Sequence, residues 1–327
     1  MLYHIFDWLA KEGFRFPGIN LFQFITFRVL LAMILSLVIT TVYGKKLIRY
    51  LQKKQLGESV RDLGLEGQNE KKGTPTMGGI IILLAILIPT LLLANLDKVY
   101  IRLMLLCTVW MGTIGFIDDY LKIRAKRMAQ AKGITYKKSD SDGLAGRFKI
   151  FGQVMLGIIV GATLYFTPSV VVKREIVKSA DIVSQAPPNP NAKFDTITID
   201  GQKRVFTDVK EIITTIPFVK NHEFNYTKLL PASWKCYAYI LYIIIVIFIV
   251  TAVSNGANIT DGLDGLATGV SAIMGICLGI FAYVSGNIKF AEYLNIMYIP
   301  NLGELSIFIA AFVGACIGFL WYNAYPA

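Results

Sequence analysis

Seven long apolar runs constrain the fold of this chain more than any other feature. Each is long enough to cross a hydrocarbon core of about 30 Å, which takes roughly 20 residues of helix. They lie near residues 20–43, 76–96, 99–117, 150–172, 236–254, 266–288 and 305–322. Because the runs are continuous rather than alternating, they predict helices and not a membrane β-barrel. With 54% hydrophobic and only 17% charged residues, the chain is predicted to be an all-α polytopic membrane protein.

The distribution of basic residues predicts how the chain is oriented. The net charge is +11, and Lys and Arg gather in the segments 44–75 and 118–149, whereas 97–98 and 289–304 hold one Lys each. The positive-inside rule places the two basic segments in the cytoplasm. Successive crossings then place the N-terminus outside, segment 255–265 inside and segment 173–235 outside.

This alternation divides the chain into three parts. Residues 1–172 hold the first four helices with the two basic cytoplasmic loops, and residues 236–327 hold the last three helices with the loop 255–265. The outside segment 173–235 contains a proline-rich break and two short alternating runs, at 196–199 and 204–207. We predict a small β-hairpin insertion there.

Two adjacent acids stand where the third apolar run ends. Asp118 and Asp119 lie within Phe-Ile-Asp-Asp-Tyr at 116–120, on the predicted cytoplasmic side. Neighbouring residues on a helix are about 100° apart, so one carboxylate can face a cavity while the other turns aside. One could act as a general base toward a lipid phosphate and the other could orient it or contact a cation. A solvated helix end is the alternative.

A second polar cluster follows the fifth run. Asn255, Asn258, Asp261 and Asp264 recur at every third position. Carboxylates at a bilayer boundary are costly unless they are solvated, paired or bound to a cation. Oxygen ligands of this kind favour a hard cation such as Mg²⁺ together with a phosphate substrate. The alternative to a cation site is that Asp261 or Asp264 caps the next helix, and such a cap is compatible with a cation site.

Basic motifs precede two of the helices on the same side. Lys71 begins the run Lys-Lys-Gly-Thr-Pro-Thr-Met-Gly-Gly at 71–79, whose cations and flexible backbone at a helix start favour anion binding. Arg147 and Lys149, in Gly-Leu-Ala-Gly-Arg-Phe-Lys at 143–149, could clamp a diphosphate. A capped helix start and an interfacial anchor are the respective alternatives. Asn323 ends the last helix on this side too.

These motifs resemble one family, the polyprenyl-phosphate N-acetylhexosamine-1-phosphate transferases, at 71–79, 116–120, 143–149, 255–267 and 318–327. They are most similar to the members that act on a muramoyl-pentapeptide. The resemblance implies that undecaprenyl phosphate attacks the β-phosphate of UDP-N-acetylmuramoyl-pentapeptide, with Mg²⁺ as cofactor, giving lipid I and UMP. It also implies a bacterial inner-membrane homodimer with about ten transmembrane helices and a cytoplasmic active site. No nucleic-acid partner is expected.

The resemblance carries over to individual residues. It implies catalytic roles for four acids, Asp118, Asp119, Asp261 and Asp264. It places a Mg²⁺ contact at Asn258. Substrate contacts are expected from the other polar residues of the motifs, which are Lys71, Lys122, Arg147, Lys149, Asn255 and Asn323.

Two other functions are compatible with parts of the sequence. A related transferase could use a simpler UDP-N-acetylhexosamine, although the runs at 73–79 and 258–265 favour the muramoyl-pentapeptide substrate. An ion-coupled transporter would also need intramembrane acids, but it would place them near the bilayer midplane rather than at helix ends.

The end of the chain at Ala327 departs from the family pattern. The family continues past Tyr-Pro-Ala at 325–327 into Phe-Met-Gly-Asp, whose aspartate ligates Mg²⁺, and later into a run of histidines. The second Mg²⁺ ligand is therefore expected beyond Ala327, and about three further helices with it. We expect a truncated chain that has little or no activity as written.

Overall fold

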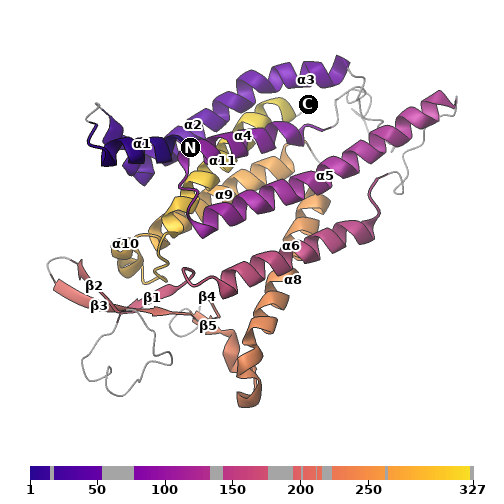
Figure 1. The fold of residues 1–327 in the computed structure, drawn as a ribbon. Helices are drawn as coiled ribbons and strands as arrows, with labels where there is room; N and C mark the ends of the chain where they lie inside the picture. Colours follow the sequence, from indigo (N-terminus) through magenta and orange to yellow (C-terminus); the bar gives the residue numbers. More distant parts are fainter. Residues whose placement is uncertain are drawn as a thin grey trace.

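The computed structural model describes residues 1–14, 18–53, 77–132, 143–175, 194–199, 202–210, 212–215, 223–261 and 264–324. Helices lie side by side in one elongated bundle, and a few short strands lie beyond one end of it (Figure 1). The α-helices are α1 (Leu2–Lys11), α2 (Ile25–Val38), α3 (Gly44–Lys53), α4 (Gly79–Leu93), α5 (Val99–Ala131), α6 (Gly146–Phe166), α8 (Ala238–Thr260), α9 (Leu266–Ser285), α10 (Ile288–Tyr293) and α11 (Leu305–Asn323). A π-helical turn, η2 (Ile39–Tyr43), joins α2 to α3, and 3-10 turns occur at η1 (Ile19–Gln23), η5 (Tyr226–Leu229), η6 (Ala232–Tyr237) and η7 (Leu302–Glu304).

The predicted multi-pass membrane architecture is confirmed. Within the described ranges, six helical segments are long and apolar enough to cross a membrane: Ile25–Leu51, Val99–Ala129, Gly146–Phe166, Ser233–Thr260, Leu266–Ser285 and Leu302–Asn323. The seventh predicted span, 76–96, corresponds to α4, which has 15 residues. These 15 residues are fewer than the roughly 20 that a helix rising 1.5 Å per residue needs to cross the hydrocarbon core.

Three predicted loops turn out to be partly helical, which corrects the boundaries taken from hydropathy. Helix α5 does not end at Asp118 but continues to Ala131, because residues such as Leu121, Lys122 and Ala125 are good helix formers in water as well. Helix α8 continues through Asn255 and Asn258 to Thr260. Part of the basic segment 44–75 forms α3. The end of an apolar run therefore marks a membrane boundary rather than a helix end.

Helix α11 is the centre of the bundle and packs against α2, α4 and α9. The buried core joins Ala32 of α2, Ile86 of α4 and Ile101 of α5 to Ala311 of α11, among other residues. Small residues allow the close approach of α11 to α2: a Cβ on Gly314 would lie only 2.5 Å from the Met33 carbonyl oxygen. Close backbone contact of this kind is typical of helix packing in membranes.

A buried ion pair ties α2 to the start of α11. The Arg28 guanidinium donates to both carboxylate oxygens of Glu304, at 2.8 and 2.6 Å, and to the Leu93 carbonyl at 3.2 Å. The guanidinium also lies over the Tyr3 ring, 4.4 Å from its centroid. Arg28 is therefore a buried structural residue that faces the bundle interior. The Asn95 backbone N–H also donates a hydrogen bond to Glu304 Oε2, at 3.2 Å.

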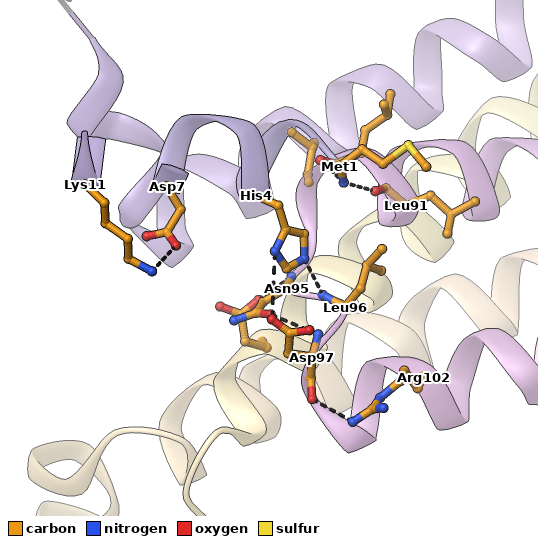
Figure 2. A network of polar contacts seen from close by, with 12 residues as sticks. Met1, His4, Asp7, Lys11, Leu91, Asn95, Leu96, Asp97 and Arg102 are labelled. Atoms are coloured by element: carbon orange, nitrogen blue, oxygen red, sulfur yellow. Dashed lines mark hydrogen bonds and ion pairs between the residues drawn. The ribbon is translucent and has the colours of Figure 1, made fainter. Parts of the chain in front are cut away.

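The N-terminal helix α1 rests on this same end of the bundle (Figure 2). The Met1 ammonium donates to the carbonyl oxygens of Leu91 and Leu92 at the end of α4. His4 accepts a hydrogen bond from the Leu96 N–H at 3.2 Å and lies 3.8 Å from Asp97.

Strands follow α6, because Pro168 cannot continue the helix that ends at Phe166. The predicted hairpin is confirmed: Thr196 pairs with Val205 and Ile197 with Arg204, between β2 (Phe194–Ile199) and β3 (Gln202–Val209). Two features of this region were missed. Strand β1 (Val172–Glu175) extends the hairpin into a sheet of order β1-β3-β2, and β4 (Ile213–Thr215) pairs with β5 (Glu223–Asn225).

The sheet is attached to the helical bundle at a defined place. The Lys173 N–H donates to the Tyr298 carbonyl at 3.1 Å, and Arg204 forms an ion pair with Glu292 of α10. The strands therefore lie at the end of the bundle that also carries α10 and α1 (Figure 1).

Candidate active site

The polar motifs gather at the opposite end of the bundle from the strands. There the second half of α5, the start of α6, the end of α8, the turn into α9 and the end of α11 come together (Figure 1). Specific contacts join these elements. Lys149 of α6 reaches Asp118 of α5, Asn255 of α8 reaches Gln153 of α6, and Gly265 packs on Asn323 of α11.

Among the predicted site residues that the structure describes, Asp118 is the best buried, with 8% of its surface exposed. Lys122 Nζ lies 2.7 Å from its Oδ2, and Lys149 Nζ lies 3.0 Å from its Oδ1. The Leu144 N–H donates to Oδ1 at 2.8 Å. Both oxygens of Asp118 are therefore engaged, and this carboxylate fixes two ammonium groups side by side.

Asp119 differs from its neighbour in exposure. Its side chain is 39% exposed, against 11% for Asp118, and it lies 3.9 Å from Lys122. The helical offset of about 100° between adjacent residues produces this difference. Asp119 is consequently the carboxylate of the pair that solvent, and hence a ligand, can approach.

The segment that begins at Gly143 folds tightly over this cluster. A Cβ at Gly143 would lie 2.5 Å from Asp118 Oδ1 and 2.9 Å from Lys122 Cε, so any larger residue would displace the charged groups.

Arg147 differs from Lys149 in its surroundings. Arg147 is exposed, and its guanidinium lies over the Phe148 ring, 5.2 Å from the ring centroid. This arrangement is typical of an interfacial anchor, which was the alternative given above for Arg147.

Asn255 and Asn258 lie on the last turns of α8. Asn255 Nδ2 donates to Gln153 Oε1 at 2.9 Å and to the Thr251 carbonyl at 2.8 Å. Asn258 and Asp261 are exposed, whereas Asp264 is partly buried. On a helix, Asn255 and Asn258 are three residues apart and share a face.

The turn between α8 and α9 rests on the end of α11. Gly265 has a φ of +76°, a left-handed conformation that favours glycine, and a Cβ there would lie 3.3 Å from the Asn323 carbonyl oxygen. Gly265 is itself the N-cap residue of α9, so neither Asp261 nor Asp264 occupies that position. Lys71 lies outside the described residues.

Sequence reasoning missed one member of this site, Gln153. Its side chain is almost fully buried between α6 and α8, and Nε2 donates to Ser254 Oγ at 3.0 Å. The signal was available, because a glutamine inside an apolar run is costly unless it is hydrogen-bonded.

The chemistry of the donor set fits Mg²⁺. Carboxylate and amide oxygens of Asn258, Asp261 and Asp264 follow one another along the end of α8 and the turn. Mg²⁺ prefers such oxygen ligands and usually takes only one or two carboxylates, completing its shell with water and substrate phosphates. Within the ranges that the structure covers, no group of three or more His, Cys, Asp or Glu side chains is suited to a metal.

Comparisons with known proteins relate this arrangement to one family. The family model described as Glycosyl transferase family 4 matches residues 195–327, and Phospho-N-acetylmuramoyl-pentapeptide-transferase signature 1 matches residues 71–83. A phospho-N-acetylmuramoyl-pentapeptide-transferase of Flavobacterium psychrophilum is 53% identical over all of this chain and 74% of its own length. The proteins of the same name from Amoebophilus asiaticus and Porphyromonas gingivalis are 51% and 49% identical, with 74% and 72% of their lengths covered.

The chain spans about three quarters of the length of these relatives. The second Mg²⁺ ligand expected beyond Ala327 stays a prediction, and so does the low activity expected of the chain as written. Identity of about one half over the whole chain shows the relationship: the chain belongs to the phospho-N-acetylmuramoyl-pentapeptide-transferase family.

Proposed function

We propose that this protein transfers phospho-N-acetylmuramoyl-pentapeptide from its UDP-linked precursor to undecaprenyl phosphate, giving lipid I and UMP in peptidoglycan synthesis. Family membership supports the reaction, and all of this chain aligns with relatives that carry the name. The observation that carries the proposal is the pair of ammonium groups, Lys122 and Lys149, held 2.7 and 3.0 Å from Asp118 at a bundle end.

The reaction exchanges one phosphoanhydride bond of the β-phosphorus for another. An oxygen of undecaprenyl phosphate forms a bond to that phosphorus, and the bond to the UMP oxygen breaks. Catalysis of such a step consists mainly of positioning and of neutralising charge on the phosphate oxygens. Two fixed ammonium groups supply this stabilisation without reorganisation during the reaction.

The acids then have distinct roles. Asp118 is saturated by its partners, so it acts by holding Lys122 and Lys149 toward the phosphates. Asp119, which is more exposed, accepts or orients the proton of the lipid phosphate. We assign the remaining substrate contacts to Asn255 and Asn323, with Lys71 as a basic contact for the nucleotide, and leave Arg147 as an interfacial anchor.

The cofactor that fits this site is Mg²⁺, which Asn258 would hold together with Asp261 and Asp264. When bound, it would act as a Lewis acid on the diphosphate and neutralise charge that develops on UMP. Removing divalent cations with EDTA should abolish UMP release, and excess MgCl₂ should restore it. Full turnover in EDTA would contradict this part of the proposal.

The membrane arrangement that supports this function requires α4 to cross as well. Gly78, before α4, packs on Phe319 at the motif end, whereas the carbonyl of Leu93, the last residue of α4, accepts from Arg28 at the other end. We infer a seventh, short crossing, a cytoplasmic site at the inner membrane, an outside N-terminus and an outside sheet. We also infer a homodimer, which light scattering of the purified protein in detergent would test.

One assay separates this function from its rivals. The protein, translated from its complete reading frame and purified in detergent, is given undecaprenyl phosphate and either UDP-N-acetylmuramoyl-pentapeptide or UDP-N-acetylglucosamine, and UMP release is measured. We expect release only with the muramoyl-pentapeptide. Release with the simpler sugar alone would identify the related transferase, and the absence of release with either would refute the proposal.

A further inference from the structure

Gln153 lies in none of the motifs, yet it touches the helix that carries two of their asparagines. We propose that Gln153 is a positioning residue that sets Asn255, and with it the last turns of α8, relative to the Asp118–Lys149 ion pair. This inference rests on the proposed function and adds to it the device that aligns α8 with the rest of the site.

Helix α6 is the element through which the two halves of the site are joined. Lys149 and Gln153 are four residues apart and therefore lie on one face of α6. Lys149 holds Asp118 of α5, and Gln153 holds Ser254 and Asn255 of α8. A further bond fixes α5 on α6 at the same level, from Trp110 Nε1 to the Gly152 carbonyl at 3.0 Å.

Both functional groups of the Gln153 amide are used. Its Oε1 accepts from Asn255 Nδ2 at 2.9 Å, and its Nε2 donates to Ser254 Oγ at 3.0 Å, in a residue only 5% exposed. A buried amide without partners is costly, so a displacement of α8 along or around α6 would break both bonds at once. The amide therefore specifies one alignment of the two helices.

The rest of the α6–α8 contact is close but unspecific. Gly157 and Gly161 bring α6 against α8, where added Cβ atoms would lie 2.7 and 3.2 Å from the Cα atoms of Ile247 and Ile243. Small residues of this kind set how near two membrane helices come, while apolar side chains allow several registers. A single polar contact is a known way to choose one register among them.

The test compares two substitutions of similar size on this interface. Gln153→Met keeps the length of the side chain and removes both hydrogen bonds. Thr251→Val, one turn before Asn255 on α8, removes a buried hydroxyl that has no hydrogen-bond partner among the described residues. We expect Gln153→Met to raise the KM for the UDP-linked substrate and to lower kcat/KM about tenfold or more, because small misplacements of binding groups are costly in catalysis. Thr251→Val should stay within about twofold of the wild type.

The KM distinguishes positioning from a merely structural role. A structural defect reduces the amount of folded enzyme, which lowers Vmax in proportion and leaves KM unchanged. A second variant, Ser254→Ala, removes only one of the two bonds and should give an intermediate effect that is less than additive with Gln153→Met. The proposal would be overturned if KM were unchanged in Gln153→Met and in Ser254→Ala. It would also be overturned if Gln153→Met and Thr251→Val lowered kcat/KM equally.

A measurement without turnover separates this proposal from the proposed function. Spin labels at the exposed positions Phe151 and Val253, in a protein whose native cysteines are replaced, report the α6–α8 distance. Gln153→Met should shift or broaden the distance distribution, and Thr251→Val should not. If the wild type releases no UMP, the proposed function fails, and the labels still decide the alignment. Identical distributions in all three proteins would overturn the role of Gln153.

Discussion

The two ends of the helical bundle use buried charge in opposite ways. At the end near the strands, Arg28 and Glu304 are 1% and 7% exposed and are joined by two hydrogen bonds. At the motif end only the acid is buried. The side chains of Lys122 and Lys149 that hold Asp118 are 43% and 34% exposed.

This difference indicates which charges are structural and which can bind. The bidentate Arg28–Glu304 pair also bonds to the Leu93 carbonyl and the Asn95 N–H, and both side chains are buried, so it offers little to a ligand. An ammonium group has three N–H donors. Lys122 and Lys149 are anchored to Asp118 on one side and reach solvent on the other, as a site for phosphate groups requires.

The strongest test of this contrast is Asp118→Asn. The substitution removes the charge that holds both lysines, so we expect UMP release to fall by two or more orders of magnitude with the fold intact. The matched control is Asp97→Asn, an exposed acid at the other end, which should keep wild-type turnover. Near-normal turnover in Asp118→Asn would remove the basis of the proposed mechanism.

At the other end the expected effect is on stability rather than on turnover. Arg28→Met leaves Glu304 as a buried unpaired charge, which typically costs about 3–5 kcal/mol, whereas Arg28→Met with Glu304→Met should recover most of the loss. Thermal unfolding in detergent measures both. The pair of Asp7 and Lys11 in α1 serves as control, because Lys11 is exposed and Lys11→Met should leave the melting temperature close to that of the wild type. A single Arg28→Met variant as stable as the wild type would show that the pair is not structural.

The α6–α8 contact can be tested apart from any charge. Gly157→Ala places a Cβ 2.7 Å from the Ile247 Cα, and forced overpacking of this kind costs about 1–3 kcal/mol. Gly269→Ala in α9 has nothing within 4 Å of the new atom and should be neutral or stabilise the helix by up to about 1 kcal/mol. The melting temperature of Gly157→Ala should therefore fall below that of the wild type, whereas that of Gly269→Ala should stay the same or rise. Equal values would mean that α6 and α8 are not closely packed.

The smallest effect separates two basic neighbours. Lys149→Met removes a cation that contacts Asp118, and we expect turnover to fall about tenfold, roughly 1.4 kcal/mol in the barrier. Arg147 is exposed and lies over Phe148, so Arg147→Met should change turnover less than about twofold. A larger loss in Arg147→Met would favour the diphosphate clamp that its position in the sequence suggested.

Several features of the fold followed from local patterns. Apolar runs predicted the membrane helices, and alternation at 196–199 and 204–207 predicted a hairpin whose strands pair at Thr196 with Val205. The acidic motifs and the basic motif at 143–149 were predicted to share one end of the bundle, and they do. What hydropathy could not locate was where α5 and α8 end, because a helix can continue in water after its apolar run has stopped.

The sequence by itself determined that this chain crosses a membrane repeatedly and brings a family's acids, amides and lysines to one end, because hydrophobicity, charge and motif spacing are local properties. Only the tertiary structure decided the partners. Arg28 meets Glu304 across 276 residues and Asn255 meets Gln153 across 102. Which polar side chain a buried group contacts depends on how helices that are distant in the sequence pack. In an apolar medium, that pairing decides whether a charge is buried with its partner or stays accessible to a ligand.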